Sequence, residues 1–438
     1  MRRNRHAAMW LGCVVLMGGL VGACGGDDGG ETTGGSGTSE TGTTEGAKVI
    51  DPKLMEGAKG DIVYCQGKDT PGDAKASIAG FNEKFASQGI TAKLVEFPAD
   101  AQQQRNQFVQ RQEAKSGECD VFSADVVWTA EFANQKWIYD LTPYIEPRKD
   151  DFIPATLATV TYDGKFWGAP DTSDSGLLYY HSKDVDGVPA TWQELYKEAA
   201  TMDGVVYQGA AYEGLTCSFL ELAFAAGGKV LSEDGKKAEF DSPENLEALK
   251  FMVEGIKDGA APKSVPTYME EEARRAFESG RATFMRNWPY AYSVGKKNKN
   301  APPFEVAPFP EWEGGGKAGI LGGHNDVISV FSENPGAALA LVDYRTTEED
   351  QLRKASEFSL PPAMASVYDD PKVKKAIPYA DQLKDAIAQA KSRPVSPVYP
   401  QISEAIYKNV NKALSGAVSP EEALKTGQAE MEQALATF

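Results

Sequence analysis

Short strand-like runs alternate with helix-like segments in the pattern of apolar and polar positions that starts at Gly60. The predicted elements, in chain order, are a strand at 61–64, a helix with Ile78, Phe81 and Phe85 on one face, a strand at 91–97 and a helix around Phe108. Alternation of this kind indicates a doubly wound α/β sheet.

Helices dominate the later part of the chain. Ser242 and Pro243 open one of them, because serine favours the N-cap position and proline the first helical position. Another begins at 419–422, where Ser-Pro-Glu-Glu is typical of a capping box. The apolar stripes of these two helices are Leu246, Leu249, Met252, Val253 and Ile256 for the first, and Leu424, Met431 and Leu435 for the second.

The first 24 residues have the pattern of an export signal. Arg2, Arg3 and Arg5 precede an apolar run at 7–20, and small residues then lead to Cys24. The segment Val-Gly-Ala-Cys resembles a bacterial lipoprotein lipobox, so we expect Cys24 to carry a lipid. An ordinary signal peptide or a short membrane span is the alternative, but the run is shorter than the roughly 20 residues that a spanning helix needs.

Polar and glycine-rich residues follow Cys24. The stretch 25–46 is almost entirely Gly, Ser, Thr, Asp and Glu, so it offers no apolar side chains for packing. We assign 25–59 to a disordered tether. This arrangement predicts an extracytoplasmic body, anchored to the cell membrane by its lipid.

Length and charge restrict the function of that body. About 390 residues remain after the tether, which suits two lobes better than one core. The formal net charge of -18 argues against nucleic-acid binding, which requires clustered Lys and Arg.

Three cysteines remain after the predicted signal and lipid site. Cys65 lies on one predicted strand and Cys119 immediately precedes another, and we expect these two to form a disulfide in an oxidising compartment. Cys217 lies among apolar residues of a predicted helix and is expected to be free and buried. Metal-ligand spacing is lacking, and His181 and His324 are far apart, so no zinc site or other cofactor is predicted.

Several ordered strings carry a more specific resemblance. They are Cys119-Asp-Val-Phe-Ser-Ala-Asp-Val-Val-Trp-Thr-Ala-Glu-Phe-Ala133, Gly164-Lys-Phe-Trp-Gly-Ala-Pro170 with Asp174-Ser-Gly-Leu-Leu-Tyr-Tyr180, Pro189-Ala-Thr-Trp192, Tyr212-Glu-Gly-Leu215, Phe284-Met-Arg-Asn-Trp-Pro-Tyr290, Gly322-Gly323 and Arg393-Pro-Val-Ser-Pro397. Together they resemble the family 1 extracellular solute-binding proteins of ATP-driven (ABC) sugar importers, most closely the trehalose/maltose-binding branch. The resemblance covers about residues 60–438.

This resemblance implies a two-lobed periplasmic-binding-protein fold, in which hinge-linked α/β lobes close over one solute. Lobe 1 would comprise 60–170 and 319–361, and lobe 2 would comprise 171–318 and 362–438. Crossings between the lobes are expected near 169–171, near Gly319 and near 361–362. The family pattern also implies a monomer that works with the permease subunits of a membrane transporter.

The resemblance also implies a set of ligand contacts. The residues that match the branch are Arg105, Asp125, Asp174, Glu213, Trp288, Tyr290, Gly323, His324 and Arg393. Six of them have a simpler alternative: a solvated helix charge for Arg105, a helix cap for Asp125 and Glu213, a turn for Asp174, core packing for Trp288 and an interlobe salt bridge for Arg393.

Two positions depart from the branch. Thr172 and His324 stand where its members usually carry aromatic residues, which reduces the apolar surface available to a second sugar ring. The departure argues against full coverage of a disaccharide and leaves a smaller or more polar solute open.

The sequence therefore predicts a non-enzymatic, lipid-anchored protein that captures a mono- or disaccharide and delivers it to a permease. The alternative is an extracellular glycoside hydrolase, because Asp125, Asp174 and Glu213 could supply the required pair of carboxylates. The chain lacks glycosidase-like motifs and matches the transporter pattern along its length. A third alternative is a calcium-binding adhesion module, which would require an Asp-x-Asp-x-Asp loop, and the sequence contains none.

Overall fold

The structure is a computed structural model that describes residues 46–437. The signal segment, Cys24 and most of the predicted tether lie outside this range. A compact unit begins at Ala47. Within the described range, no helix combines the length and the apolar character that crossing a lipid bilayer requires.

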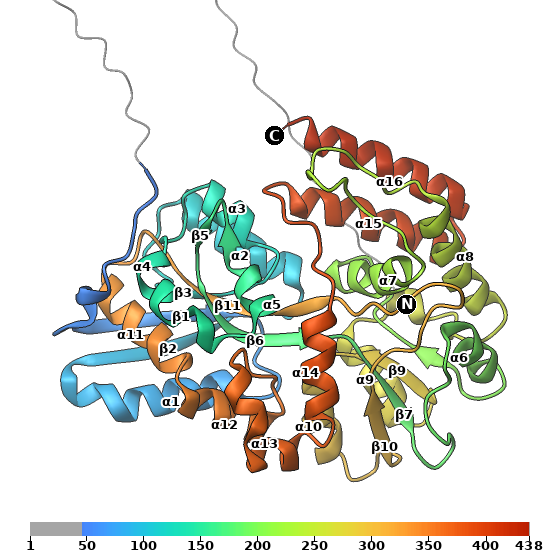
Figure 1. The fold of residues 1–438 in the computed structure, drawn as a ribbon, viewed down its shortest axis with the longest axis horizontal. Helices are drawn as coiled ribbons and strands as arrows, with labels where there is room; N and C mark the ends of the chain where they lie inside the picture. The colour runs from blue at the N-terminus through green and yellow to red at the C-terminus, as the bar shows by residue number, and fades with distance from the viewer. Residues whose placement is uncertain (1–45, 438) are drawn as a thin grey trace, which may run out of the picture. The chain divides into compact units, whose positions relative to one another are not determined.

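Five strands form the first sheet. They are β1 (Gly60–Gln66), β2 (Ile90–Glu96), β3 (Val121–Asp125), β6 (Ala169–Ser175) and β11 (Leu321–Ile328). Their order in the sheet is β2-β1-β3-β11-β6 (Figure 1). β1 pairs in parallel with β2 and β3, whereas β11 runs antiparallel to β3 and β6. The elements around this sheet are called the first lobe.

Four shorter strands form the second sheet, whose surrounding elements are called the second lobe. They are β7 (Leu177–His181), β8 (Val205–Val206), β9 (Phe284–Asn287) and β10 (Phe304–Ala307). The order is β10-β7-β9-β8, with β7 antiparallel to both β9 and β10 and with β8 parallel to β9. A separate two-stranded ribbon joins β4 (Thr161–Tyr162) and β5 (Lys165–Phe166).

Helices cover both sheets. Those before β6 are α1 (Asp73–Phe85), α2 (Ala101–Glu113), α3 (Thr129–Asn134), α4 (Thr142–Ile145) and α5 (Pro154–Thr159). Those between β7 and β10 are α6 (Trp192–Ala199), α7 (Glu213–Ala225), α8 (Pro243–Lys257), α9 (Glu270–Glu278) and α10 (Tyr290–Lys297). Those after β11 are α11 (Pro335–Arg345), α12 (Glu348–Phe358), α13 (Pro371–Ala376), α14 (Ala380–Gln389), α15 (Tyr399–Leu414) and α16 (Pro420–Leu435). Short 3₁₀ turns are η1 (Pro52–Met55), η2 (Ala86–Gln88), η3 (Glu146–Asp151), η4 (Val265–Thr267) and η5 (Ala365–Asp369).

The predicted helix starts are confirmed by their caps. The Ser242 side chain accepts a hydrogen bond from the backbone N–H of Asn245 at 3.2 Å, and Ser419 accepts one from Glu422 at 3.2 Å. Each bond satisfies a donor that the first helical turn would otherwise leave free. In the second lobe α15 packs against α16 and α7, and α16 also contacts α8 (Figure 1).

The predicted disulfide between Cys65 and Cys119 is confirmed, and it joins β1 to the residues just before β3. An aromatic cluster covers this side of the first sheet, centred on Phe108, which contacts Phe122 and Trp128 edge to face. Cys217 is free and buried in α7, as predicted.

The chain passes between the lobes at three places. β6 of the first sheet continues through Gly176 into β7 of the second, and β11 returns to the first sheet after 308–320. The third passage lies at 391–398, beside the second one. There the Lys391 N–H donates to the Gly319 carbonyl at 2.8 Å, and the Leu321 N–H donates to the Lys391 carbonyl at 3.0 Å.

Two segments lie elsewhere than the predicted borders imply. Residues 363–390 form α13 and α14, which contact α12, α5 and β6 of the first lobe, so the chain does not cross at 361–362. At the other end, Ile50 is 1% exposed and its N–H donates to the Asp140 carbonyl at 2.9 Å. The ordered unit therefore includes 47–59, which the sequence pattern places in the tether, because apolar residues hold this stretch on the first lobe. The first crossing is displaced as well: it is expected near 169–171, but 171–175 complete β6 of the first sheet and the chain leaves that sheet at Gly176.

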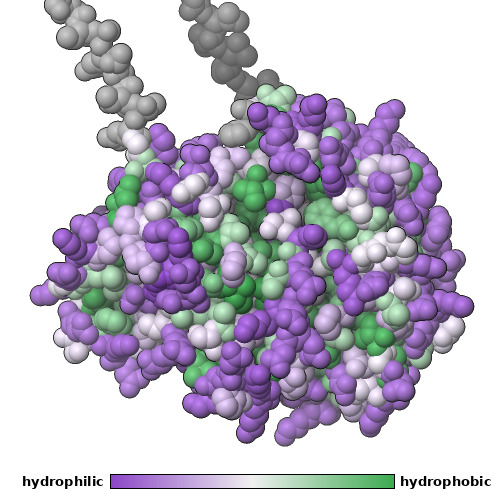
Figure 2. Space-filling model, in the orientation of Figure 1, coloured by the Kyte–Doolittle hydropathy of each residue, from purple (hydrophilic) through white to green (hydrophobic). Residues whose placement is uncertain are grey.

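The surface agrees with the acidic composition. The face shown in Figure 2 is mostly polar, and apolar residues appear in smaller areas between the polar ones. The large apolar side chains that are exposed are Val49, Leu54, Met202 and Val395.

Candidate functional site

A large cavity is lined by residues of both lobes. It encloses about 1330 Å³ of atom-free space, part of which is open to solvent. The first lobe contributes the loop after β1, the start of α2, the end of β3 and the middle of β6 and β11, and the second lobe contributes the starts of α7, α9 and α10. Eight of the nine predicted contacts line it: Asp125, Asp174, Glu213, Trp288, Tyr290, Gly323, His324 and Arg393.

Arg393 joins the two lobes at this cavity. Its Nη1 donates to Glu213 Oε1 at 2.7 Å, and its Nη2 donates to Asp125 Oδ1 at 3.1 Å. Glu213 also accepts from Tyr399 and Ser403, each at 2.5 Å. The interlobe salt bridge is therefore present, and all three charged residues also line the cavity.

Burial sets the electrostatics of this group. It raises the pKa of Glu213, while the nearby Arg393 guanidinium opposes the shift by favouring the ionised carboxylate. The Nε of Arg393 has no hydrogen-bond partner among residues 46–437. A guanidinium with a spare buried donor beside a cavity is suited to bind an oxygen-rich solute.

Asp174 presents a carboxylate that the protein leaves incompletely paired. Its Oδ1 is buried and has no hydrogen-bond partner within the described part of the chain. Burial and the neighbouring Asp125 charge raise its pKa to about 7. Asp174 lies within β6 rather than in a turn, paired with Gly322 of β11, so the strand fixes its position.

Aromatic side chains form the second-lobe wall. Trp288 and Tyr290 stand at the end of β9 and the start of α10, and Tyr212 precedes α7. Trp288 packs against the second-lobe core but stays partly exposed, as a platform for a ligand must be. The Tyr290 hydroxyl donates to Glu271 Oε1 at 3.0 Å, which keeps the ring in place.

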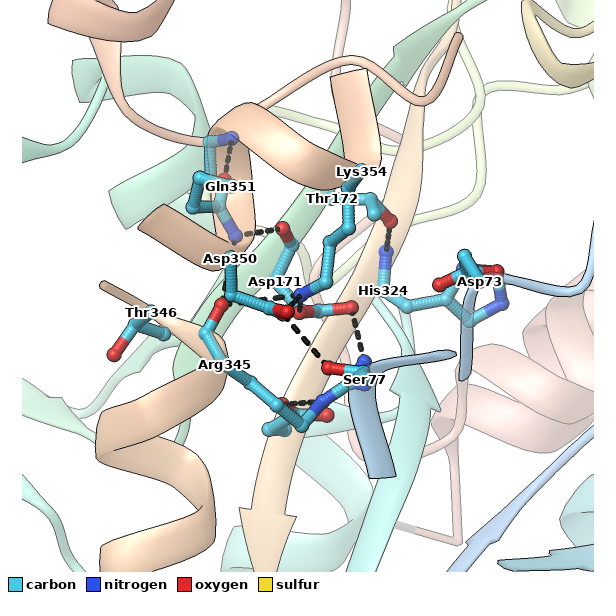
Figure 3. A network of polar contacts seen from close by, with 12 residues as sticks. Asp73, Ser77, Asp171, Thr172, His324, Arg345, Thr346, Asp350, Gln351 and Lys354 are labelled. Atoms are coloured by element: carbon cyan, nitrogen blue, oxygen red, sulfur yellow. Dashed lines mark hydrogen bonds and ion pairs between the residues drawn. The ribbon is translucent and has the colours of Figure 1, made fainter. Parts of the chain in front are cut away.

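The two positions that depart from the family pattern are neighbours. The backbone N–H of His324 donates to Thr172 Oγ1 at 3.2 Å, across the β11–β6 pairing (Figure 3). Burial lowers the pKa of His324, which favours the neutral imidazole. Gly323 precedes it with a φ of 109°, and a Cβ there would overlap the Thr172 carbonyl oxygen. Glycine is thus required for β11 to approach β6 this closely.

Arg105 is the predicted contact that the structure places elsewhere. Its guanidinium forms a two-pronged ion pair with Glu131 of α3, and it does not line the cavity. The preceding residue, Gln104, lines the cavity instead and donates to the Ala99 carbonyl at 3.0 Å. The helix α2 therefore turns Gln104 to the cavity and Arg105 to the neighbouring helix.

A buried ionic network supports the first-lobe wall (Figure 3). Arg345 donates to Asp326 Oδ2 at 2.7 Å and to Asp171 Oδ2 at 2.6 Å. Lys354 pairs with Asp171 and lies 3.1 Å from Asp350 Oδ2. Of these residues, Asp171 alone lines the cavity. The network therefore holds the part of β6 from which Thr172 and Asp174 also line the cavity.

Several lining residues were missed at the sequence level. Asp69 and Asp73 follow β1, while Glu270 and Glu271 open α9. The rule that ligands bind beyond the carboxyl ends of parallel strands could have found the first pair, since it also identified Asp125. Burial and the nearby Asp69 raise the pKa of Asp73 to about 7. No local signal distinguishes the second pair from ordinary acidic residues in a first helical turn.

Comparison with known proteins gives consistent results. The family model described as bacterial extracellular solute-binding protein matches residues 67–352. A protein named probable ABC transporter-binding protein from Deinococcus radiodurans is 34% identical over 365 residues, which cover 78% of this chain and 86% of that protein.

Solved structures extend the likeness to the fold. Maltose-bound MalE3 of T. maritima superposes with a TM-score of 0.80 and 35% identity, over 85% of this chain and 99% of that one. An ABC transporter solute-binding protein of Thermotoga lettingae, bound with α-D-tagatose, gives a TM-score of 0.78 and 26% identity, over 86% and 99% of the two chains. The predicted two-lobed periplasmic-binding-protein fold is confirmed.

Proposed function

Because the chain belongs to the bacterial extracellular solute-binding protein family, we propose that it captures a sugar outside the cytoplasm and delivers it to an ABC importer. The solute is a mono- or disaccharide of the glucose, trehalose or maltose type. The protein acts as a monomer, performs no chemistry on the solute, and hands it to the permease subunits in the membrane.

The observation that carries this proposal is the combination of aromatic faces and carboxylates in one cavity between the lobes. Trp288, Tyr290 and Tyr212 supply aromatic faces on the second lobe, which suit the apolar C–H surface of a sugar ring. The first lobe supplies Asp125 and Asp174, whose carboxyl oxygens suit its hydroxyl groups.

The known relatives support the same solute class. The 35% identical MalE3 structure contains maltose, and a maltotriose-binding protein of Pyrococcus abyssi is 25% identical over 284 residues. Thr172 and His324 present less apolar surface than a pair of aromatic residues would, so we propose that the cavity covers one sugar ring well and a second ring less fully.

Native mass spectrometry of the freshly purified protein tests the proposal most directly. We expect a bound mass of one hexose or one disaccharide, and titration of the stripped protein with glucose, maltose and trehalose then ranks the candidates. Failure of all three sugars to bind, together with a co-purified solute that is not a carbohydrate, would refute the proposal. A turnover assay on small glucosides should show no hydrolysis.

Trp288→Ala tests the aromatic wall. We expect the sugar affinity to fall by about 1–3 kcal/mol, the value of one stacking and burial contact, while the melting temperature changes little. The exposed residue Met202 offers a control, since Met202→Ala removes a large side chain away from the cavity. Loss of most of the stability in the Trp288 variant would show that this ring belongs to the core instead.

We further propose that Cys24 carries a lipid that holds the body at the outer face of the cell membrane. The support is the segment 21–24 and the polar tether after it. Cys24→Ser should move the protein from the membrane fraction to the released fraction. An unchanged distribution would contradict the lipid anchor without affecting the sugar-binding proposal.

A further inference from the structure

Arg286 lies directly beneath the proposed sugar platform. It is on β9 and only 2% exposed, and its guanidinium carbon lies over the Trp288 ring, 4.0 Å from the ring centroid. This distance is well within the range of a cation–π contact. One side of the Trp288 ring is therefore occupied by a charge of the protein itself.

Two side chains hold the guanidinium in one orientation. Arg286 Nε donates to Glu221 Oε2 at 2.8 Å, and Nη2 donates to Glu221 Oε1 at 2.6 Å. Nη1 donates to Gln208 Oε1 at 2.7 Å. Glu221 is 1% exposed, so solvent does not compete for this fork. A planar group gripped at three nitrogens has little freedom to rotate.

The ring is also confined on another side. A Cβ on Gly322 of β11 would lie 2.9 Å from Trp288 Cζ3, so the first-lobe backbone approaches the edge of the indole closely. The Trp288 backbone is fixed in addition, because its N–H donates to Asn287 Oδ1 at 2.8 Å and its carbonyl accepts from the Tyr179 hydroxyl at 2.7 Å.

We propose that Arg286 is a positioning residue for solute binding, which fixes Trp288 in the orientation that a sugar ring requires. The inference rests on the proposed sugar-binding function, and it assigns Arg286, Glu221 and Gln208 a role although none of them lines the cavity. A ring that is ordered before binding loses less conformational entropy when the solute arrives, so the affinity is higher.

The alternative is that the Glu221–Arg286 pair only stabilises the second lobe. Buried ion pairs contribute little net stability compared with apolar residues of similar size. Lysine would also satisfy the Glu221 charge, but it lacks the planar fork that fits both the carboxylate and the indole face. The arrangement thus favours orientation over stability as the function of this arginine.

Three variants test the inference in the full chain. Glu221→Gln with Arg286→Met removes both charges together, so that neither is left buried and unpaired. Arg286→Lys keeps the charge and removes the fork. The Trp288 signal is followed by fluorine NMR after 5-fluorotryptophan incorporation, and Trp288→Phe identifies the resonance by its loss.

We expect a single sharp Trp288 resonance in the wild type and a broadened or split one in the double variant, with Arg286→Lys in between. The affinity for the sugar found by mass spectrometry should fall about fivefold or more, as expected for the loss of one cation–π contact. Arg148→Met is the matched control, because Arg148 lies over the Tyr144 ring at 5.3 Å and outside the cavity. This control should leave both readouts unchanged.

A folded double variant whose Trp288 resonance stays sharp, or whose affinity stays within twofold of the wild type, overturns the inference. If the double variant does not fold, the same two criteria apply to Arg286→Lys. If the wild type binds no sugar, the proposed function fails, but the resonance of the solute-free protein still decides whether Arg286 orders the ring.

Discussion

Two of the buried groups of ion-paired side chains differ in what surrounds them. The first group, called the first-lobe cluster, consists of Asp171, Asp326, Arg345, Asp350 and Lys354. All of its members come from β6, β11, α11 and α12 of one lobe. Each of its side chains is at most 4% exposed, so the cluster is closed to solvent.

The second group, called the cavity cluster, consists of Asp125, Glu213 and Arg393. Its members come from β3, from α7 and from the passage between the lobes, and all three line the cavity. Asp125 and Glu213 are 15% and 14% exposed. We therefore expect the removal of one partner to cost mainly stability in the first-lobe cluster and mainly binding in the cavity cluster.

The largest effect should come from breaking the first-lobe cluster. Arg345→Met leaves Asp171 and Asp326 buried with Lys354 as their remaining cation, and we expect a loss of about 3–5 kcal/mol in the free energy of unfolding. Urea denaturation measures this change. Lys374→Met is the control, since Lys374 forms an exposed pair with Asp381 and should change stability by less than about 0.5 kcal/mol. Equal midpoints for the two variants would contradict the structural role of the cluster.

A smaller effect, on binding rather than stability, should follow from changing the cavity cluster. Arg393→Lys keeps the charge but cannot donate to Asp125 and Glu213 in the same geometry. We expect the sugar affinity to fall by about 1.5–3 kcal/mol, which corresponds to a charge-assisted hydrogen bond, with a smaller loss of stability than in Arg345→Met. Calorimetric titration and urea denaturation together separate the two quantities.

The exposed Arg281, whose side chain donates to Ser279 Oγ outside the cavity, provides the control for this substitution as Arg281→Lys. It should bind the sugar as the wild type does. An Arg393→Lys protein that binds normally but is strongly destabilised would place the cavity cluster in the same class as the first-lobe cluster.

The two clusters also show what could be predicted from the sequence. Arg393, Asp125 and Glu213 were found because each lies in a string that resembles the family. Arg345 and Lys354 stand in helices with no distinguishing motif, and their partners are distant in sequence, so only the fold brings them together. Local strand and helix patterns and helix caps were equally predictable, because their signals are short-range. The disulfide joins cysteines 54 residues apart, and it was predicted from their positions at two strands and from the oxidising compartment.

Arg105 shows where the resemblance was insufficient. Its position on α2 matched the family, yet Glu131 lies within reach and forms a fork with its guanidinium. The packing of α2 against α3, which decides between the cavity and the neighbouring helix, is a tertiary property. The crossing expected at 361–362 failed for the same reason, since α13 and α14 carry no local sign of the lobe against which they pack.

The smallest measurable effect concerns Asp174, a cavity carboxyl that belongs to neither cluster. Its pKa of about 7 in the folded protein lies above the value of about 3.9 expected in the unfolded chain. Between these two values the folded state binds the proton more tightly, so this group contributes stability at low pH that is lost as the pH rises through 7. Asp174→Asn cannot titrate, so the stability difference between wild type and variant should decrease with rising pH by about 1.1 kcal/mol per pH unit between pH 5 and 7, because the folded state holds nearly one extra proton at pH 5 and about half of one at pH 7. Thermal or urea unfolding across this range measures the slope, with the exposed Asp385→Asn on α14 as the control for losing one carboxylate.

The two outcomes are read from plots of stability against pH. Parallel plots for wild type and Asp174→Asn would show that this carboxyl is solvated like the rim of the cavity. Converging plots would distinguish it from the paired carboxylates of both clusters, as a group that the protein leaves free for its solute.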